Sequence, residues 1–265
     1  RTHISEPELE GLVKNSVNSK QLVATTKIQK ADVFIIAVPT PFKKDNKPDL
    51  SFVKSACEEI STVLKKGDLV ILESTCPVGA TEKVREWLQN KRKDLTFPDI
   101  KNSNIQHDIS IAHSPERVLP GNVIEELVKN DRIIGGLTPK CSEKALSFYK
   151  IFVKGDCVVT DSRTAELCKL VENSFRDLNI AFANEVSLIC DNLEINVWDL
   201  INLANKHPRV EILNPGPGVG GHCLAVDPWF IVDTSPEHSK LIKTARQVND
   251  SKPEFILNKL KRVVS

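Results

Sequence analysis

The sequence has almost no net charge, no C-x-x-C pair and no long apolar run, and each lack excludes a class of function. Its 36 basic and 35 acidic residues leave a formal net charge of +1, so electrostatics give no reason to expect a nucleic acid or an anionic membrane as partner. Seven cysteines without C-x-x-C spacing argue against a disulfide framework or a zinc site, and we expect no bound metal. No stretch approaches the roughly 20 apolar residues of a membrane span, and no signal peptide is visible. The reducing cytoplasm is therefore the expected location.

Methionine is missing altogether, and the sequence opens on Arg1. Both features lead us to expect an N-terminal part that precedes the residues shown. The 265 residues, of which 40% are hydrophobic and 27% charged, are enough to bury a sizeable core in one or two domains.

Short apolar runs alternate with helical patterns over residues 1–160. This alternation predicts an α/β fold with a parallel sheet and right-handed crossovers. Three of the expected strands end in polar loops with proline, at 39–41, 73–79 and 113–117, and such sheets bind ligands at that edge. The expected strands are 22–26, 33–38, 68–74, 109–112, 132–136 and 157–160, and the expected helices are 6–17, 50–64, 79–93 and 139–152.

The pattern changes after residue 160. Residues 162–190 contain neither proline nor glycine, and their apolar positions recur close to every 3.6 residues, which predicts one long helix. Two further helices are expected at 197–205 and 236–250. We therefore divide the chain into a sheet domain, 1–160, and a mainly helical domain, 161–265.

The loop that leads to Cys223 is the most informative segment. Four glycines and two prolines between positions 215 and 221 precede Cys223, and Asp227 follows four residues later. Glycine allows a close approach to a ligand, and proline restricts the backbone, so this loop has a defined shape. A thiol on such a loop is a candidate nucleophile. The alternative is a tight turn with an ordinary buried cysteine.

Other polar residues stand where chemistry is possible. Lys169 and Asn173 are four residues apart on one face of the long helix, where they can stabilise an oxyanion or be an exposed lysine and an unrelated asparagine. Glu116 follows a strand and can act as an acid or base or form a loop contact with Arg117. Thr75 can order a water or a cofactor amide, or cap a helix.

Taken together, these segments resemble the UDP-glucose/GDP-mannose dehydrogenase family, and within it the branch that oxidises UDP-N-acetyl-D-mannosamine. The resemblance covers nearly the whole chain, and its last motif is highly specific. The matching segments are Ala37-Val-Pro-Thr-Pro-Phe42, Leu72-Glu-Ser-Thr75, Ser114-Pro-Glu-Arg-Val-Leu-Pro-Gly121, Lys169-Leu-Val-Glu-Asn-Ser-Phe-Arg-Asp177 and Pro215-Gly-Pro-Gly-Val-Gly-Gly-His-Cys223.

The resemblance implies an oxidation in two NAD-dependent hydride transfers, in which the C6 alcohol of the UDP-sugar becomes an aldehyde and then a carboxylate. Cys223 would attack the aldehyde to give a thiohemiacetal, and the second hydride transfer would leave a thioester for water to hydrolyse. Lys169 would stabilise the oxyanions together with Asn173. Lys169, Glu116 and Asp227 would carry the acid–base steps, and the resemblance does not assign each step to one of them. Alternatively, Asp227 would orient Lys169.

The same resemblance implies the binding residues and the partners. Thr75 would order the hydrolytic water, and a homodimer would form through the long helix. NAD is expected to contact Val38, Pro39, Thr40, Ser74, Thr75 and Glu116. The UDP-sugar is expected to contact Lys169, Asn173, Arg209, Gly220, Gly221 and His222.

Two departures from the family pattern leave alternatives open. The first βαβ unit of the family, with its G-x-G-x-x-G turn and ribose-binding acid, is not found in the sequence, and the sequence stops at Ser265, where the central helices of the family end. We therefore expect a Rossmann-like domain without its first βαβ unit, and a shortened, inactive chain stays open beside an active enzyme. The alternatives are a one-step NAD-dependent hydroxyacid dehydrogenase and a non-catalytic protein that dimerises through its long helix.

Overall fold

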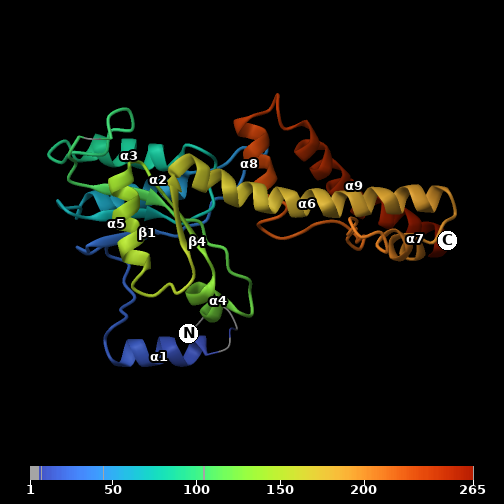
Figure 1. Cartoon of the computed structure of the whole chain (residues 1–265), viewed down its shortest axis with the longest axis horizontal. Helices are drawn as coiled ribbons and strands as arrows, with labels where there is room; N and C mark the ends of the chain where they lie inside the picture. Colours follow the sequence, from blue (N-terminus) through green and yellow to red (C-terminus); the bar gives the residue numbers. More distant parts are fainter. Residues whose placement is uncertain (1–5, 7, 44, 104, 265) are drawn as a thin grey trace. The chain divides into compact units, whose positions relative to one another are not determined.

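Five strands of four or five residues form one sheet in the computed structural model, which describes residues 6, 8–43, 45–103 and 105–264 (Figure 1). The inner strand at 69–72 is wholly apolar and wholly buried, as expected where both faces of a sheet are covered. The strands lie in the order of the sequence: β1 (Val33–Ile36), β2 (Leu69–Leu72), β3 (Ser110–His113), β4 (Arg132–Gly136) and β5 (Cys157–Asp161).

The sheet is parallel except at one junction. β1, β2 and β3 are parallel neighbours, as are β4 and β5, but β4 runs antiparallel to β3. The connection from β3 to β4 contains only the short helix α4 (Val123–Lys129) and returns along the same edge instead of crossing the sheet. The α/β, Rossmann-like class is confirmed, and the expectation of a wholly parallel sheet is corrected at this junction.

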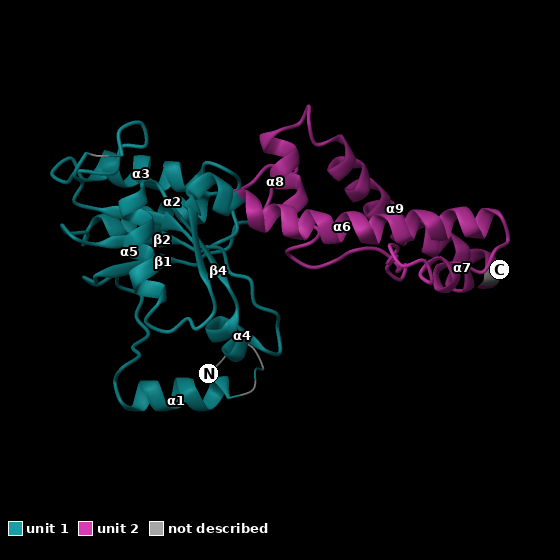
Figure 2. Ribbon diagram, in the orientation of Figure 1, with its two compact units in different colours: residues 1–40, 50–166 teal, residues 41–49, 167–265 magenta. Residues whose placement is uncertain are grey.

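The chain divides into two units (Figure 2). Unit 1 consists of residues 1–40 and 50–166, and unit 2 of residues 41–49 and 167–265. The expected strand at 22–26 does not form. Residues 21–30 are exposed, and no described strand pairs with them, so a β-rich composition alone does not form a strand there.

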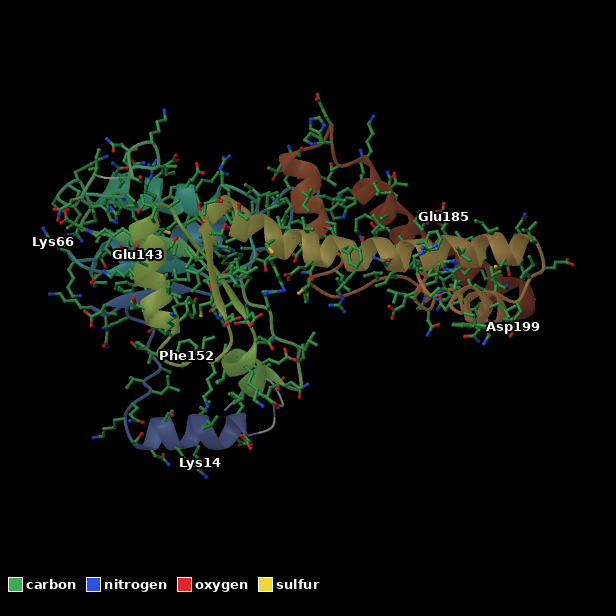
Figure 3. All side chains as sticks on the ribbon, in the orientation of Figure 1. Lys14, Lys66, Glu143, Phe152, Glu185 and Asp199 are labelled. Carbon is green, nitrogen blue, oxygen red and sulfur yellow. The ribbon has the colours of Figure 1, made fainter. Side chains whose placement is uncertain are left out.

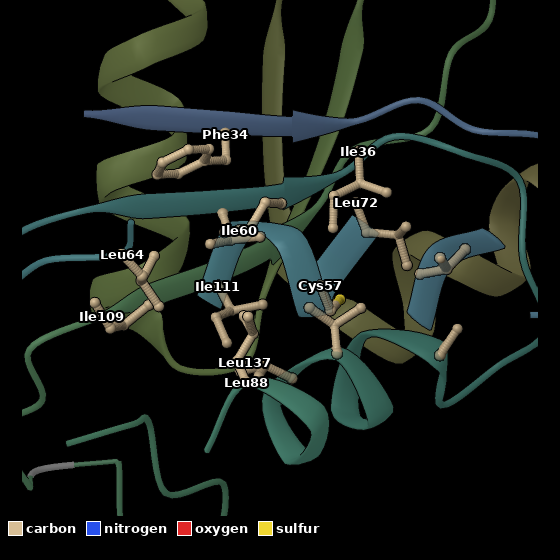
Figure 4. Close-up of a cluster of buried hydrophobic side chains, with 14 of the residues drawn as sticks. Phe34, Ile36, Cys57, Ile60, Leu64, Leu72, Leu88, Ile109, Ile111 and Leu137 are labelled. Carbon is tan, nitrogen blue, oxygen red and sulfur yellow. The ribbon is translucent and has the colours of Figure 1, made fainter. Parts of the chain in front are cut away.

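Unit 1 has a helix layer on each face of its sheet. Helices α2 (Ser51–Ser61) and α3 (Ala80–Lys91) pack on one face, where Ile60 and Leu88 meet Ile111 (Figure 4). Helix α5 (Pro139–Tyr149) packs on the other face through Tyr149. Charged side chains such as Lys66 project outward (Figure 3). Helix α1 (Leu9–Asn18) has no buried residue.

Unit 2 is helical. Helix α6 (Ser162–Asn192) begins in unit 1, where Asp161 accepts hydrogen bonds from the amide and hydroxyl of Thr164, and runs on through unit 2. It is followed by α7 (Val197–Ala204), α8 (Asp227–Thr234) and α9 (Lys240–Val264). The sequence pattern missed α8 and placed α9 between 236 and 250. Within the described residues, no helix is long and apolar enough to cross a membrane, and no group of three or more potential ligands could hold a metal ion.

Candidate active site

The nucleophile candidate lies on an exposed loop whose far end is fixed. Cys223 is exposed, and its carbonyl oxygen accepts the amides of Val226 at 3.0 Å and Asp227 at 2.9 Å. These bonds start the turn that becomes α8. Gly218 and Gly221 have φ values of 137° and 88°, a region that side chains disfavour, which explains the glycines of the loop. The thiol and the carboxylate are therefore tied to one turn.

Asp227 is held in a small buried cluster within unit 2. The side-chain amide of Asn173 donates to its Oδ2 at 2.6 Å, and both residues are buried. α8 packs onto α6 through Phe230 and Leu170, which sets Asp227 opposite Asn173. Burial raises the pKa of Asp227 to about 6, against the opposing effects of the Asn173 hydrogen bond and the charge of Lys169. A carboxyl group with such a pKa can exchange protons near neutral pH.

The cofactor candidates of unit 1 lie where β1 and β2 end side by side. The hydroxyl of Ser74 accepts the amide of Val38 at 2.8 Å and donates to the carbonyl oxygen of Val38 at 2.7 Å. The hydroxyl of Thr40 donates to the carbonyl oxygen of Thr75 at 2.6 Å. Pro39, between them, is exposed. The two strand-end loops therefore form one tied edge in which Val38, Thr40 and Thr75 keep part of their surface accessible.

Glu116 is fixed by an arginine from β4. Its Oε1 accepts the amides of Arg117 at 2.6 Å and Val118 at 3.0 Å, and its Oε2 pairs with Arg132 at 3.2 Å. Arg132, whose side chain is 6% exposed, also pairs with Glu73 at 3.0 Å. A buried arginine thus bridges two carboxylates that follow β2 and β3. Glu116 and Thr75 belong to unit 1, whereas Cys223 and Lys169 belong to unit 2.

Two residues that the sequence pattern passed over, Arg132 and Glu166, support the site. Arg132 is a charged residue at the start of an apolar strand, which was a usable signal. Glu166 accepts the amides of Gly79 at 2.6 Å and Thr81 at 2.7 Å, and so holds the first turn of α3, into which the Thr75 loop leads. Burial raises the pKa of Glu166. Nothing in the local sequence marks Glu166, because its partners are about 85 residues away.

The remaining substrate candidates make few contacts. Arg209 and His222 are exposed, as are Gly220 and Gly221. The amide of Arg209 donates to the ring of His207 at 3.3 Å, and no atom outside the loop lies within 4 Å of a Cβ placed on Gly220 or Gly221. Their roles stay predictions.

Comparison with known proteins identifies the family. Residues 1–153 match the UDP-glucose/GDP-mannose dehydrogenase family, NAD binding domain, and residues 163–251 match the central domain of that family. The UDP-N-acetyl-D-mannosamine dehydrogenase of Yersinia pestis is 62% identical over 99% of this chain and 62% of its own length. The NDP-N-acetyl-D-galactosaminuronic acid dehydrogenase of Ralstonia solanacearum is 60% identical with the same coverage.

Solved structures agree with this assignment. A UDP-D-ManNAc dehydrogenase from Pyrococcus horikoshii superposes with a TM-score of 0.89 at 41% identity, over 98% of this chain and 61% of that one. The UDP-N-acetyl-mannosamine dehydrogenase of Staphylococcus aureus gives 0.86 at 45%, over 100% and 61%. The chain spans about 62% of the length of the curated relatives it matches. The resemblance seen in the motifs is confirmed, and the chain belongs to the UDP-glucose/GDP-mannose dehydrogenase family.

Proposed function

We propose that the protein is an NAD-dependent nucleotide-sugar 6-dehydrogenase that oxidises the C6 alcohol of UDP-N-acetyl-D-mannosamine to the carboxylate. The observation that carries this proposal is the fixed turn from Cys223 to Asp227, with Asn173 bonded to that carboxylate at 2.6 Å. A one-step hydroxyacid dehydrogenase needs no such thiol. The names of the relatives from Yersinia pestis and Pyrococcus horikoshii support UDP-N-acetyl-D-mannosamine as the substrate.

The residues present fit one end of NAD. The edge formed by Val38, Thr40 and Ser74 lies at the carboxyl ends of parallel strands, where open α/β sheets bind their ligands. Bound there, NAD supplies the hydride acceptor for each oxidation. The spacing Gly216, Gly218 and Gly221 matches G-x-G-x-x-G, but these glycines lie between α7 and α8, so they do not form the pyrophosphate-binding turn that follows a strand.

The residues of the chain then divide the chemistry. The thiolate of Cys223 attacks the aldehyde carbon, a C–S bond forms, and the carbonyl oxygen takes up a proton. Lys169 and Asn173 stabilise that oxygen while it carries charge. Loss of the second hydride and of the hydroxyl proton leaves a thioester, and water splits the C–S bond to release the carboxylate. Lys169, Glu116 and Asp227 are the groups that carry the protons, and Thr75 orders the water.

The stoichiometry of NADH tests this function. The native protein is expected to release two NADH for each UDP-N-acetyl-D-mannosamine consumed. It should turn over UDP-N-acetyl-D-galactosamine and UDP-glucose more slowly. One NADH per sugar would favour the hydroxyacid dehydrogenase. No NADH with any sugar, and no heat of NAD binding, would favour the non-catalytic alternative.

We further infer a homodimer formed through α6. We also assign residues 1–160 to a sheet domain and residues 161–265 to a helical central domain that contains this helix. Four apolar side chains on one side of α6 are between 49% and 68% exposed, namely Val171, Phe175, Phe182 and Ile189. Their spacings of four and seven residues align them along the helix. A surface of this kind is expected to be covered by a partner, and the copy of the same helix in a second chain fits a symmetric contact.

Charge placed on this stripe is expected to separate the dimer. Phe175→Glu with Phe182→Glu should give a monomer by light scattering after size exclusion, because two buried carboxylates would lose their hydration in the interface. Arg176→Glu, exposed on α6 outside the stripe, is the matched control and should remain a dimer. A double variant that stays dimeric would contradict this interface.

A further inference from the structure

A continuous buried hydrogen-bond chain runs from α9 and α6 to the root of the Cys223 loop. Asn184 on α6 accepts the amide of Gly216 at 2.8 Å and donates to the Oδ1 of Asn249 at 2.9 Å. Asn249 donates to the Oδ1 of Asp177 at 2.8 Å, and Arg246 donates to the same oxygen at 2.5 Å. The four side-chain-bearing residues are at most 1% exposed.

The polarity of this chain leaves each amide only one orientation. The carboxylate of Asp177 can only accept, so Asn249 must turn its NH₂ toward it and its oxygen toward Asn184. Asn184 then turns its NH₂ toward Asn249, and its oxygen is left for the amide of Gly216. Through Asn249, the buried ion pair of Arg246 and Asp177 thus fixes the side-chain oxygen of Asn184 as the acceptor for the loop amide of Gly216. In a buried network, removal of one member leaves its neighbours unpaired.

A second contact fixes the same root. Gly218 has a φ of 137°, and a Cβ there would lie 3.0 Å from Cγ of Pro253 and 3.3 Å from the carbonyl oxygen of Asn249. The loop therefore runs directly against α9 at this position, and a side chain there would have to displace its neighbours by a few tenths of an ångström at a φ that favours glycine. Gly216 has no atom within 4 Å of its Cβ position, so its contact is confined to its amide.

The segment beyond these two anchors is open. Gly220, Gly221 and Cys223 are exposed, and the next fixed point is the carbonyl oxygen of Cys223, bonded to Val226 and Asp227. The four residues 219–222 are thus suspended between an anchored root and an anchored turn. Loss of the contact at Gly216 or at Gly218 leaves this short segment held firmly at one end only. The number of loop conformations then increases, and the thiol is misaligned.

We propose that Asn184, oriented by Asn249 and Asp177, is a positioning residue for Cys223. This inference rests on the proposed function, because only the aldehyde stage of that reaction uses the thiol. The first hydride leaves the alcohol carbon before any C–S bond forms. A loosened root therefore slows the second oxidation much more than the first, and free aldehyde accumulates.

Asn184→Ala in the native protein tests the role. The amide of Gly216 should exchange hydrogen faster by at least tenfold, as followed by mass spectrometry of the loop peptide. The rate of the second oxidation should fall by roughly 10- to 100-fold, as expected for a displacement of about 1 Å, while the first oxidation changes less than about threefold. An aldehyde trap should lower the yield from two NADH per sugar toward one. Asn192→Ala, at the exposed end of the same helix, is the control.

Gly218→Ala disturbs the same root from the loop side and leaves no buried group unpaired, so it covers the case in which Asn184→Ala fails to fold. It should show the same selective loss of the second oxidation, and Gly216→Ala, whose Cβ meets nothing, should not. Equal slowing of both oxidations in Asn184→Ala and Gly218→Ala would overturn the proposal, as would unchanged exchange at Gly216 in Asn184→Ala. A wild-type protein that yields no NADH would refute the proposed function instead, and the exchange result would still decide whether Asn184 anchors the loop.

Discussion

Cys223→Ser is expected to stop the reaction after one hydride transfer. The hydroxyl of serine is a far weaker nucleophile than a thiolate at neutral pH. The rate of complete oxidation should fall by roughly 10⁴-fold or more, in the range seen when a covalent nucleophile is removed. The first hydride transfer should stay within about threefold of the native rate.

Rapid mixing with UDP-N-acetyl-D-mannosamine and NAD would show this as a burst of one NADH per site followed by a stall. Cys157→Ser is the matched control, because Cys157 is a half-buried thiol of β5 in unit 1 and should leave both phases intact. If Cys223→Ser still produced two NADH per sugar at a native rate, the thiol would have no covalent role.

The strand and helix pattern of unit 1 was predictable because buried strands and amphipathic helices write their periods into the sequence. The direction of β4 was not, because an apolar run such as Arg132–Gly136 reads the same whichever way it pairs. The continuation of α9 was hidden for a related reason. Pro253 lies inside the helix, where proline normally removes a hydrogen bond and indicates a helix end.

The candidate site divides in the same way. Cys223, Lys169 and Asn173 could be picked out from local motifs, and the contact of Asn173 with Asp227 joins residues 54 apart. Asn184 could not, because its partners Gly216 and Asn249 lie 32 and 65 residues away. Residues that touch the reacting atoms carry unusual local patterns, whereas residues that hold them in place are recognised only once distant segments are seen together.

Asp227→Asn is expected to stabilise the fold near neutral pH while it removes most of the activity. The pKa of the Asp227 carboxyl is raised from 3.8 to about 6, chiefly because it is buried. The folded state therefore binds this proton more tightly than the unfolded state does. The contribution to stability is complete below about pH 4 and is lost as the pH rises through 6. Two pKa units correspond to roughly 3 kcal/mol, which sets an upper limit on the loss.

Asparagine at position 227 cannot ionise, so the variant escapes this loss. Urea unfolding at pH 4.5, 5.5 and 7 should show the free energy of unfolding of Asp227→Asn rising relative to the native protein by about 2 kcal/mol across that window, because the remainder of the loss already occurs below pH 4.5. Asp233→Asn, at an exposed position of the same helix, is the matched control. A stability difference that does not change with pH would mean that Asp227 is not held in a buried, proton-binding environment.

Activity should move in the opposite direction. A carboxylate at position 227 accepts a proton or holds Lys169 in place. An amide cannot accept the proton and attracts Lys169 only weakly, so kcat should fall by roughly 10²- to 10⁴-fold. In the native protein kcat should rise as the pH passes through about 6, and this limb should be absent from the residual activity of the variant. A group that destabilises the fold in the charged form the reaction needs is expected of a functional site. If Asp227→Asn were both more stable and fully active, the carboxylate would have no part in the reaction, and the acid–base steps would pass to Lys169 and Glu116.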